Sequence, residues 1–493
     1  MMPFRSRHSR VAIIDIGSNS IRMVVYDDLK RAAVPLYNEK LLCQLGKNLA
    51  TTGRLYEEGV VLAREALARF VALARNMDVG ALSVMATAAV RDAEDGREFA
   101  RAIEREYRID VDIISGDREA KLGAYGICAS VFAPSGITGD LGGGSMELVH
   151  LEGAALLNHV TLPIGPLRLL DELKGRRAAM RKAIEGRFQN IPWLKETEAR
   201  HFYAIGGSFR AIAKLHMQAA GYPLRILHQY EVEARQFAAF AAELAAMPAA
   251  KLAKLPGLAG KRVPTITPAA MILEQVLEVT KASCIVFSAS GIREGYLFEK
   301  LPMHVREQDV LLAICREFAG RLGHAEAYAR ELLAWMDPLL MQETAQEKRL
   351  RAGLCYIVDI ALHIHPEYRA EWSMQRVLYS AFTGITHRER AMVALALYHR
   401  YQFKLKEEPG VLSLVNQRER AWARLVGTIA NLAYHLSGST PGTLSQITLG
   451  TEKDAVTLAF SRGAEALMGE AISKRIVGVE EAWRRWREEA GKP

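Results

Sequence analysis

The sequence Asp15-Ile16-Gly17-Ser18-Asn19-Ser20 links two apolar runs that are typical of strands, at 11–14 and 21–26. The sequence Asp140-Leu141-Gly142-Gly143-Gly144-Ser145 repeats this arrangement farther along the chain. Each is predicted to form a tight strand–loop–strand turn with an acidic residue at its mouth. Small residues leave backbone N–H groups free to wrap a phosphate, and an acid at a strand end can hold the divalent cation that a phosphate carries. Two such turns predict a duplicated α/β fold with phosphate bound between its halves.

The composition is that of an ordinary globular protein with an excess of positive charge. The chain has 493 residues, of which 50% are hydrophobic and 24% are charged. This length is enough for roughly two to four domains with cores of their own. The formal net charge of +8 favours an anionic partner such as nucleic acid, polyphosphate or a nucleotide.

The sequence contains features that predict a cytoplasmic protein without membrane contact. No apolar run reaches the roughly 18 residues that are needed to span a bilayer. Residues 1–10 are basic but lack the apolar core of a signal peptide, so a short disordered tail is expected there. Five cysteines lie far apart and form no Cys-X-X-Cys pair, which argues against zinc sites and a disulfide framework.

Strands and helices alternate in two successive blocks. Strands are expected at 11–16, 21–26, 36–43, 82–86 and 111–114, with helices at about 57–76, 96–107 and 117–131. After a break at Ala133-Pro134-Ser135-Gly136, strands are expected at 137–140, 146–151, 156–162, 202–205 and 284–288, with a helix at 208–219. The repetition predicts an internal duplication, with one domain over 11–133 and a second over 134–302.

From about residue 303 the pattern changes to long helices. Apolar residues have helical spacing over 312–340, 347–363 and 376–401. Alternating residues at 444–449 and 456–460 predict a hairpin, and an amphipathic helix ends the chain. We therefore expect an all-α region over 303–493, with a small hairpin and a subdivision near 435.

Four further positions could carry chemistry when judged from the residues alone, and two of them are glycine-rich or strand positions. Gly206-Gly207-Ser208 lies between a strand and a helix, where backbone N–H groups can bind phosphate, although a plain glycine turn would have the same sequence. Glu147 shares a strand face with Ser145 and could hold a metal or its water, or could face solvent.

Glu119 and Arg91 also have two interpretations each. Glu119 lies in the first turn of a helix, where a carboxylate is favoured by the helix dipole as a simple cap. Arg91 follows a strand and could meet phosphate oxygens with its planar guanidinium, or could pair on the surface with Asp92 or Asp95.

Seven ordered motifs make the chain resemble the exopolyphosphatase/guanosine pentaphosphate phosphohydrolase (Ppx/GppA) phosphatase family over about 10–300. They are DIGSNSIRM (15–23), ATAAVRDA (86–93), ISGDREAKLGAYG (114–126), GDLGGGSMELV (139–149), LPIGPLRL (162–169), YAIGGSFRAIA (203–213) and SASGIREG (288–295). The resemblance implies a duplicated actin-like, ribonuclease H-like ATPase fold. It also implies removal of a terminal phosphate from inorganic polyphosphate or from guanosine pentaphosphate (pppGpp).

The resemblance also assigns roles to residues of this sequence. It places the family's catalytic carboxylate on Glu119 and its phosphate-binding arginine on Arg91. Its phosphate-loop acids fall on Asp15 and Asp140, so Mg²⁺ is expected at Asp140, with Asp15 and Glu147 as further ligands. The expected phosphate-binding residues are Gly17, Ser18, Asn19, Ser20, Gly142, Gly143, Gly144, Ser145, Gly206, Gly207 and Ser208.

The C-terminal region resembles the helical, HD-phosphohydrolase-like appendage of longer family members. Val358-Asp359 stands where the His-Asp pair of a working metal site would fall. His363, His365 and His387 remain, but a His/Asp metal cluster needs the missing ligand. We expect this region to mediate dimerisation or to guide a long anionic chain.

These observations predict a Mg²⁺-dependent exopolyphosphatase in which Glu119 is the general base. One alternative is a pppGpp 5′-phosphohydrolase, and another is a nucleotide-gated regulatory protein that hydrolyses little. The expected partners are inorganic polyphosphate, pppGpp or another nucleotide, and a second copy of the chain. Neither nucleic acid nor a membrane is expected as a partner.

Overall fold

The computed structural model describes residues 10–197, 199–322, 326–405 and 410–491. The chain divides into two compact units, Met1–Gln308 and Asp309–Pro493. Residues 1–9 of the expected basic tail lie outside the described residues. Each unit is described by itself below.

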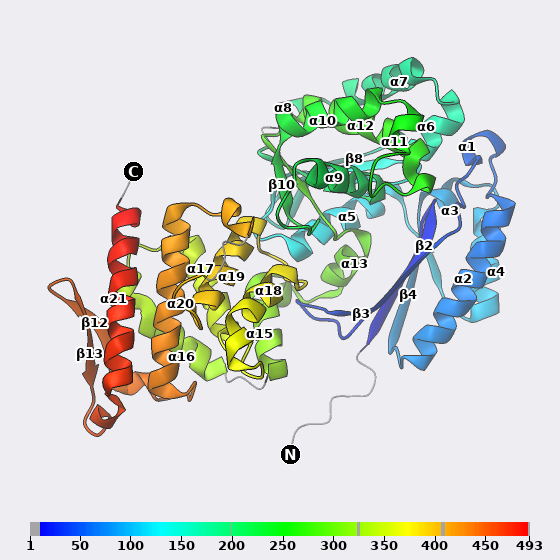
Figure 1. The fold of residues 1–493 in the computed structure, drawn as a ribbon. Helices are drawn as coiled ribbons and strands as arrows, with labels where there is room; N and C mark the ends of the chain where they lie inside the picture. Colours follow the sequence, from blue (N-terminus) through cyan, green and yellow to red (C-terminus); the bar gives the residue numbers. More distant parts are fainter. Residues whose placement is uncertain (1–9, 198, 323–325, 406–409, 492–493) are drawn as a thin grey trace. The chain divides into compact units, whose positions relative to one another are not determined.

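The first half of unit 1 is built on a five-stranded sheet (Figure 1). Its strands are β1 (Val11–Ile16), β2 (Ser20–Tyr26), β3 (Pro35–Leu42), β4 (Ala81–Ala86) and β5 (Val111–Ile113), in the order β3-β2-β1-β4-β5. The β1–β2 and β2–β3 pairs are antiparallel, and the β1–β4 and β4–β5 pairs are parallel. The helices are α1 (Leu49–Thr52), α2 (Glu57–Asn76), α3 (Ala88–Asp92) and α4 (Gly96–Tyr107), and α2 and α4 cover one face of the sheet. The five predicted strands are confirmed.

The second half repeats this topology. Its strands are β6 (Ser135–Leu141), β7 (Met146–Glu152), β8 (Ala155–Leu162), β9 (His201–Ile205), β10 (Tyr230–Glu233) and β11 (Cys284–Phe287), in the order β10-β11-β9-β6-β7-β8. Strands β8-β7-β6-β9-β11 correspond in order and direction to β3-β2-β1-β4-β5. The extra edge strand, β10, is only four residues long and was not predicted.

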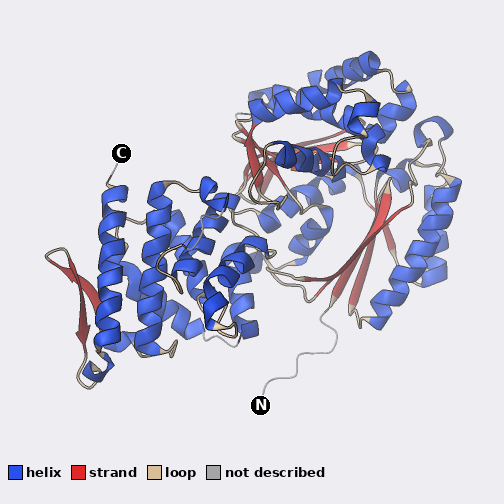
Figure 2. Cartoon of the chain, viewed as in Figure 1, coloured by secondary structure: helices blue, strands red, loops and turns tan. Residues whose placement is uncertain are grey.

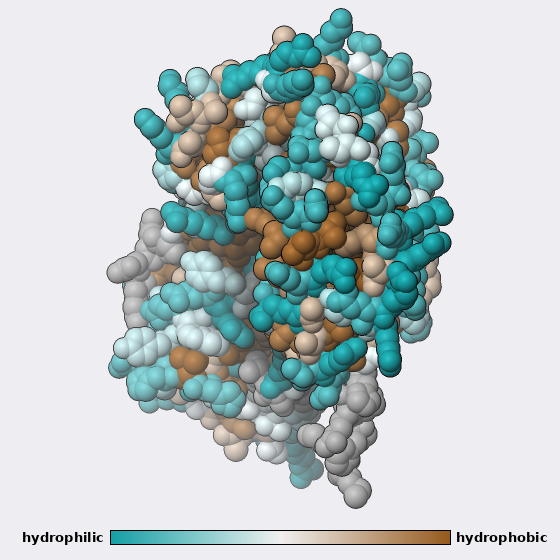
Figure 3. Space-filling model, turned by 90° about the vertical axis from the view of Figure 1, so that its right-hand side faces the viewer, coloured by the Kyte–Doolittle hydropathy of each residue, from teal (hydrophilic) through white to brown (hydrophobic). Residues whose placement is uncertain are grey.

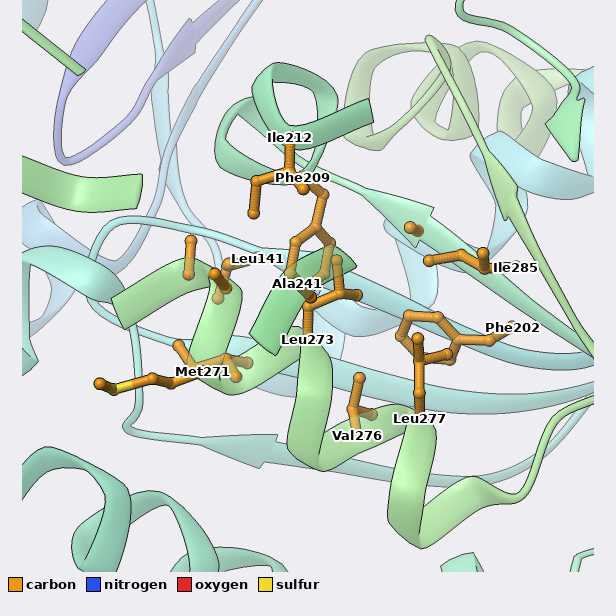
Figure 4. Close-up of a cluster of buried hydrophobic side chains, with 14 of the residues drawn as sticks. Leu141, Phe202, Phe209, Ile212, Ala241, Met271, Leu273, Val276, Leu277 and Ile285 are labelled. Carbon is orange, nitrogen blue, oxygen red and sulfur yellow. The ribbon is translucent and has the colours of Figure 1, made fainter. Parts of the chain in front are cut away.

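Helices of the second half cover the outer face of its sheet with a large apolar core. They are α6 (Pro166–Leu173), α7 (Arg177–Gln189), α8 (Pro192–Glu196), α9 (Gly207–Ala219), α10 (Ala234–Ala246), α11 (Ala249–Leu252) and α12 (Val263–Thr280), with a 3₁₀ turn at Gly260–Arg262. Figure 4 shows Phe202 of β9 and Phe209 of α9 in this core, and their ring centroids are 6.5 Å apart. Burial of each such side chain contributes about 1.5–3 kcal/mol to folding.

Helices α5 (Gly116–Ser130) and α13 (Ile292–Lys300) lie between the two sheets (Figure 1), and α14 (Met303–Arg306) follows. They cross at very short range: a Cβ atom on Gly295 would lie 1.8 Å from the carbonyl oxygen of Leu122. The Tyr26 hydroxyl donates a hydrogen bond to Glu294 at 2.8 Å, which ties α13 to the first sheet. This packing directs the first turn of α5 toward the two glycine loops.

Unit 2 is helical apart from one hairpin (Figure 2). Its helices are α15 (Val310–Leu322), α16 (Glu326–Met336), α17 (Ala345–Ile357), α18 (Arg369–Tyr379), α19 (His387–His399), α20 (Gln417–Ser437) and α21 (Glu470–Ala490). Single 3₁₀ turns cover Asp337–Leu339, Pro366–Tyr368, Gly410–Leu414, Leu444–Gln446 and Glu465–Leu467. The predicted hairpin is confirmed as β12 (Ile447–Glu452) and β13 (Ala455–Phe460), and β13 contacts α21.

The long helical runs expected in this unit are shorter than their apolar spacing suggested. The 347–363 run ends as a helix at Ile357, and the 376–401 run is split between α18 and α19. Gly384 adopts a left-handed conformation with φ of +70°. Thr386 then caps α19 in a capping box with Glu389, which starts a new helix inside the apolar pattern. In the 312–340 run, residues 323–325 lie outside the described residues.

The surface of the molecule is mixed in character. Figure 3 shows a mostly hydrophilic face on which hydrophobic residues gather across the middle. Within the part of the chain that the structure describes, no helix is long and apolar enough to cross a membrane.

Candidate active site

The first glycine loop is a tight turn that joins β1 to β2. The Gly17 N–H donates a hydrogen bond to the Ser20 carbonyl at 3.0 Å, and the Gly46 N–H donates to the Ser18 carbonyl at 2.9 Å. Asp15 stands at the end of β1 directly before this turn, as predicted from the sequence. The loop is therefore held by backbone bonds and leaves its other N–H groups available to an anion.

The second loop, between β6 and β7, has the same backbone geometry. The Gly142 N–H donates to the Ser145 carbonyl at 3.0 Å, which matches the bond from Gly17 to Ser20. The two loops approach each other closely, since a Cβ atom on Gly143 would lie 3.2 Å from the Cβ atom of Ser18. A glycine at this position therefore lets the two halves of unit 1 meet at their glycine loops.

A cleft with a volume of about 490 Å³ opens in front of these loops. Of the predicted site residues, it is lined by Asp15, Gly17, Ser18, Asn19, Ser20, Glu119, Asp140, Gly142, Gly143, Ser145, Gly206, Gly207 and Ser208. Arg91, Gly144 and Glu147 do not line it. The structure thus brings segments from both halves and the first turns of α5 and α9 to one cavity.

The third glycine segment places a helix N-terminus at the cleft. Gly206 has φ of +108°, and a Cβ atom there would lie 2.4 Å from the Leu141 carbonyl oxygen, so only glycine fits. Helix α9 begins at the next residue, and its first N–H groups and positive dipole end face the cavity. This arrangement suits an anion.

Glu119 is a buried carboxylate with a fixed cationic partner. Its side chain is 7% exposed, and Arg91 donates a hydrogen bond from Nη1 to its Oε2 at 2.9 Å. Arg91 also binds the Ile114 carbonyl at 3.0 Å and Asp92 at 3.3 Å. Arg91 was expected either to meet phosphate or to pair with Asp92 or Asp95. In the structure it binds Asp92 and also holds Glu119.

Several carboxylates converge on this point, and burial opposes their ionisation. Burial raises the pKa of Glu119 to about 7, against the Arg91 contact that lowers it, while Asp140 and Asp15 add to the rise. Burial likewise raises the pKa of Asp140 to about 6, and Arg210 opposes this rise. Burial, with the charges of Glu119 and Asp140, raises the pKa of Glu147 well above its ordinary value.

The donor atoms suit a magnesium ion that is shared with substrate rather than enclosed by protein. Among the described residues, no group of three or more His, Cys, Asp or Glu side chains is arranged to hold a metal. Asp15 is held by Arg293 at 2.7 Å, whereas Glu147 Oε1 and Ser145 Oγ are buried without a hydrogen-bond partner. Mg²⁺ commonly uses one or two carboxylates together with phosphate oxygens, so Asp140 with a bound phosphate would fit it.

A cluster of cations that was not predicted from the sequence lines the same cleft. The cluster consists of Arg22, Lys40, Arg210, Lys261, Arg262 and Arg293. Burial, followed by the charges of Arg262, Arg210 and Arg22, lowers the pKa of Lys40 to about 8. Burial and then the charge of Arg293 lower the pKa of Arg210 to about 10, and Arg210 Nε has no hydrogen-bond partner. Arg293 is paired with Asp15, but the like charges of the cluster still repel one another. A bound anion would reduce this repulsion.

Two signals in the sequence could have found part of this cluster. Arg22 lies opposite Asp15 and Lys40 in the register of β1, β2 and β3, and the predicted strand–loop–strand turn already indicates the pairing of β1 with β2. Arg293 belongs to SASGIREG (288–295), one of the seven motifs that carry the family resemblance. The Arg293 guanidinium binds Asp15, which lies 278 positions earlier in the sequence. No local sequence pattern indicates this contact.

In unit 2, the Asp359 carboxylate is bound by an arginine. Arg400 Nη2 donates to Asp359 Oδ1 at 2.9 Å, and the Ser439 hydroxyl binds Oδ2. Both side chains of the Arg400–Asp359 pair are almost fully buried. The Arg400 guanidinium thus neutralises Asp359, the acid that remains where the His-Asp pair would fall.

Comparisons with known proteins agree with this architecture. Residues 13–304 match the family described as the Ppx/GppA phosphatase family, and residues 311–481 match the family described as exopolyphosphatase, C-terminal. The retrograde regulation protein 2 of Saccharomyces cerevisiae is 26% identical over 487 residues, covering 87% of this chain and 81% of the yeast protein.

Two solved structures share the fold of unit 1. A crystal structure of an exopolyphosphatase from Cytophaga hutchinsonii is 24% identical and covers 59% of this chain and 97% of its own, with a TM-score of 0.54. An exopolyphosphatase-like protein is 21% identical and covers 59% of this chain and 96% of its own, with a TM-score of 0.50. The predicted duplicated actin-like fold, followed by a helical region, is confirmed.

Proposed function

Because the chain belongs to the Ppx/GppA phosphatase family, we propose that it is an exopolyphosphatase that hydrolyses the terminal phosphate of inorganic polyphosphate. One observation carries this proposal: six cations line a cleft that ends at two phosphate-binding turns and a buried carboxylate. Acids at the same surface are Asp15, Glu119 and Asp140, so positive groups outnumber them. A polyanion would relieve the repulsion among the cations.

Glu119 is proposed as the general base. Hydrolysis of a phosphoanhydride needs an oriented water and neutralised phosphate oxygens, with little covalent chemistry by the protein. A base works best when its pKa lies near the operating pH, and burial brings the pKa of Glu119 to about 7. Arg91 would keep its carboxylate in a fixed direction, with one oxygen bound and the other available to water.

The backbone turns would bind the oxygens of the phosphate that is removed. The loops Gly17 to Ser20 and Gly142 to Ser145 offer N–H groups from opposite sides, and the α9 N-terminus offers more. Asp140 would hold Mg²⁺ against the substrate, with Glu147 behind it, and the ion would offset charge on the phosphate oxygens. Asp15 is held by Arg293, which makes it a weaker candidate ligand than Asp140.

The lining of the cleft favours polyphosphate over pppGpp. Recognition of a guanine base commonly uses stacking on an aromatic side chain. Among the described residues that line the cleft, none is aromatic, whereas six are cations. A chain of repeating phosphates would contact such a surface along its length.

The proposal is tested by phosphate release from long-chain polyphosphate and from pppGpp with Mg²⁺, using the wild-type chain and Glu119→Gln. We expect the wild type to prefer polyphosphate and the variant to bind it while releasing about 10²–10⁴-fold less phosphate. Glu98→Gln is the matched control, because Glu98 lies in the first turn of α4 and is exposed. Tight binding of polyphosphate or nucleotide by the wild type without hydrolysis would instead support the regulatory alternative, which the name of the yeast relative suggests.

A further inference from the structure

A chain of four charged side chains connects the two halves of unit 1 beside the cleft. Arg168 Nη2 donates to Asp92 Oδ2 at 2.9 Å, and Arg91 Nε donates to Asp92 Oδ1 at 3.3 Å. Arg91 Nη1 then donates to Glu119 Oε2 at 2.9 Å. Each carboxylate oxygen of Asp92 therefore serves a different arginine, and one of these arginines holds the proposed base.

Arg168 also contacts the second glycine loop directly. Its Nε donates to the Gly144 carbonyl at 3.0 Å, next to residues that line the cleft. Arg168 belongs to α6 in the second half of unit 1, whereas Arg91 and Asp92 belong to α3 in the first half (Figure 1). The four contacts therefore run from a phosphate-binding turn of one half, through α3 of the other, to Glu119.

We propose that Asp92 and Arg168 are positioning residues for phosphate release: they orient Arg91, and through it Glu119, relative to the Gly142–Ser145 loop. This inference rests on the proposed function of Glu119. Neither residue lines the cleft that contains Glu119, and both line a smaller neighbouring cavity beside Gly143 and Gly144. Their effect would be on the geometry of the base, and a small misplacement of a catalytic group has a large effect on rate.

If Asp92 and Arg168 had only a structural role, their loss would lower the thermal stability of the protein. The positioning role predicts no such loss. The side chains of Asp92 and Arg168 are 35% and 25% exposed, and ion pairs of this kind add little to stability. Loss of the pair should therefore leave thermal unfolding nearly unchanged. Arg168 has a second acidic partner, Glu172, at 3.7 Å and one helical turn away, which does not lead to Arg91 and so provides a matched control.

The test measures kcat and KM on polyphosphate with Mg²⁺ for Asp92→Asn, Arg168→Gln, Arg168→Lys and Glu172→Gln. We expect Asp92→Asn and Arg168→Gln to lower kcat roughly 10- to 100-fold with little change in KM. Arg168→Lys should recover part of this loss, and Glu172→Gln should behave as the wild type. A rise in KM at constant kcat would overturn the proposal, because it would show a role in binding.

Combination with Arg91→Gln tests whether the effect passes through Arg91. The effects of two substitutions that act through one shared contact are not additive. Asp92→Asn should therefore have no further effect on kcat in the Arg91→Gln background. Additive losses would overturn the proposal.

A crystal structure of Asp92→Asn separates this inference from the proposed function. We expect Arg91 to leave Glu119 in the variant, and retention of the 2.9 Å contact would overturn the positioning role. If the wild-type chain releases no phosphate from any phosphoanhydride, the proposed function fails, and the position of Arg91 in this crystal structure still decides the inference.

Discussion

The two halves of unit 1 share a topology but differ in charge at equivalent positions. In the first half, Asp15, Arg22 and Lys40 lie side by side across β1, β2 and β3. In the second half, the corresponding row across β6, β7 and β8 is Asp140, Glu147 and Thr161. The acid at the mouth of the loop is common to both rows, and its neighbours differ.

Under the proposed function, this difference would divide the binding of substrate and of Mg²⁺ between the two halves of unit 1. The cations of the first row face the cleft and would hold a polyanion, while the acids of the second row would hold Mg²⁺ beside Glu119. The polar groups of the second row are also less satisfied, since Glu147 Oε1 and Thr161 Oγ1 are buried without hydrogen-bond partners. Such groups are costly in a folded protein unless a ligand or water completes them.

The sharpest test of this division exchanges the two loop acids for amides. Asp140→Asn should lower kcat about 10³-fold and abolish the magnesium titration, because a metal contributes several kcal/mol to stabilisation of the transition state. Asp15→Asn should have a smaller effect and keep the magnesium midpoint, because Asp15 is already bound by Arg293. Magnesium titrations of phosphate release measure both. Equal losses of magnesium dependence would break the comparison.

The cations of the first row should act on binding rather than on turnover. Arg22→Gln and Lys40→Gln should each raise KM for long polyphosphate about tenfold and make its salt dependence shallower, as expected when one cation–phosphate contact is lost. KM measured at several salt concentrations checks this. Lys47→Gln is the control, because Lys47 is exposed and does not line the cleft. A loss of kcat at unchanged KM would assign these residues to the chemistry instead.

The value of kcat/KM should decline at both low and high pH, because Glu119 loses its charge at low pH and Lys40 loses its charge at high pH. Glu119, with its pKa raised to about 7, is protonated at lower pH and cannot accept a proton, so activity should rise through pH 7. Lys40, with its pKa lowered to about 8, becomes neutral at higher pH, so binding should weaken above that value. Lys40→Arg should remove the alkaline limb, since arginine stays charged over this range. An alkaline limb that persists in this variant would exclude Lys40 as its source.

Much of unit 1 was predictable because its signals are local. Strand β1, the glycine loops and the first turn of α5 are each determined by a few neighbouring residues. The Arg22–Lys40 pair was missed because register across a sheet, not spacing along the chain, makes these residues neighbours. Strand β10 has only four residues, which is too few to show a period. Helix α10 (Ala234–Ala246) was also not predicted, although its apolar periodicity matches that of α2. In unit 2, caps such as Thr386 interrupt apolar patterns that spacing alone would continue.

The smallest expected effect is on stability, at the middle position of the second row. Burial raises the pKa of Glu147 well above its value in an unfolded chain, so folding costs more as the pH rises above that unfolded value. Glu147→Gln removes this cost. In EDTA, it should raise the melting temperature at pH 8 by roughly 2–4 °C for each kcal/mol gained, and the gain should vanish at pH 4.

Thermal unfolding at both pH values measures this effect, with Glu152→Gln as the control. Glu152 ends the same strand but is exposed, and it should show no such pH-dependent gain. A destabilised Glu147→Gln variant would mean that the carboxylate is charged and held in the folded protein. The second row would then be an ion-paired structural element, and the contrast with the cationic row of the first half would not reflect a division of catalytic work.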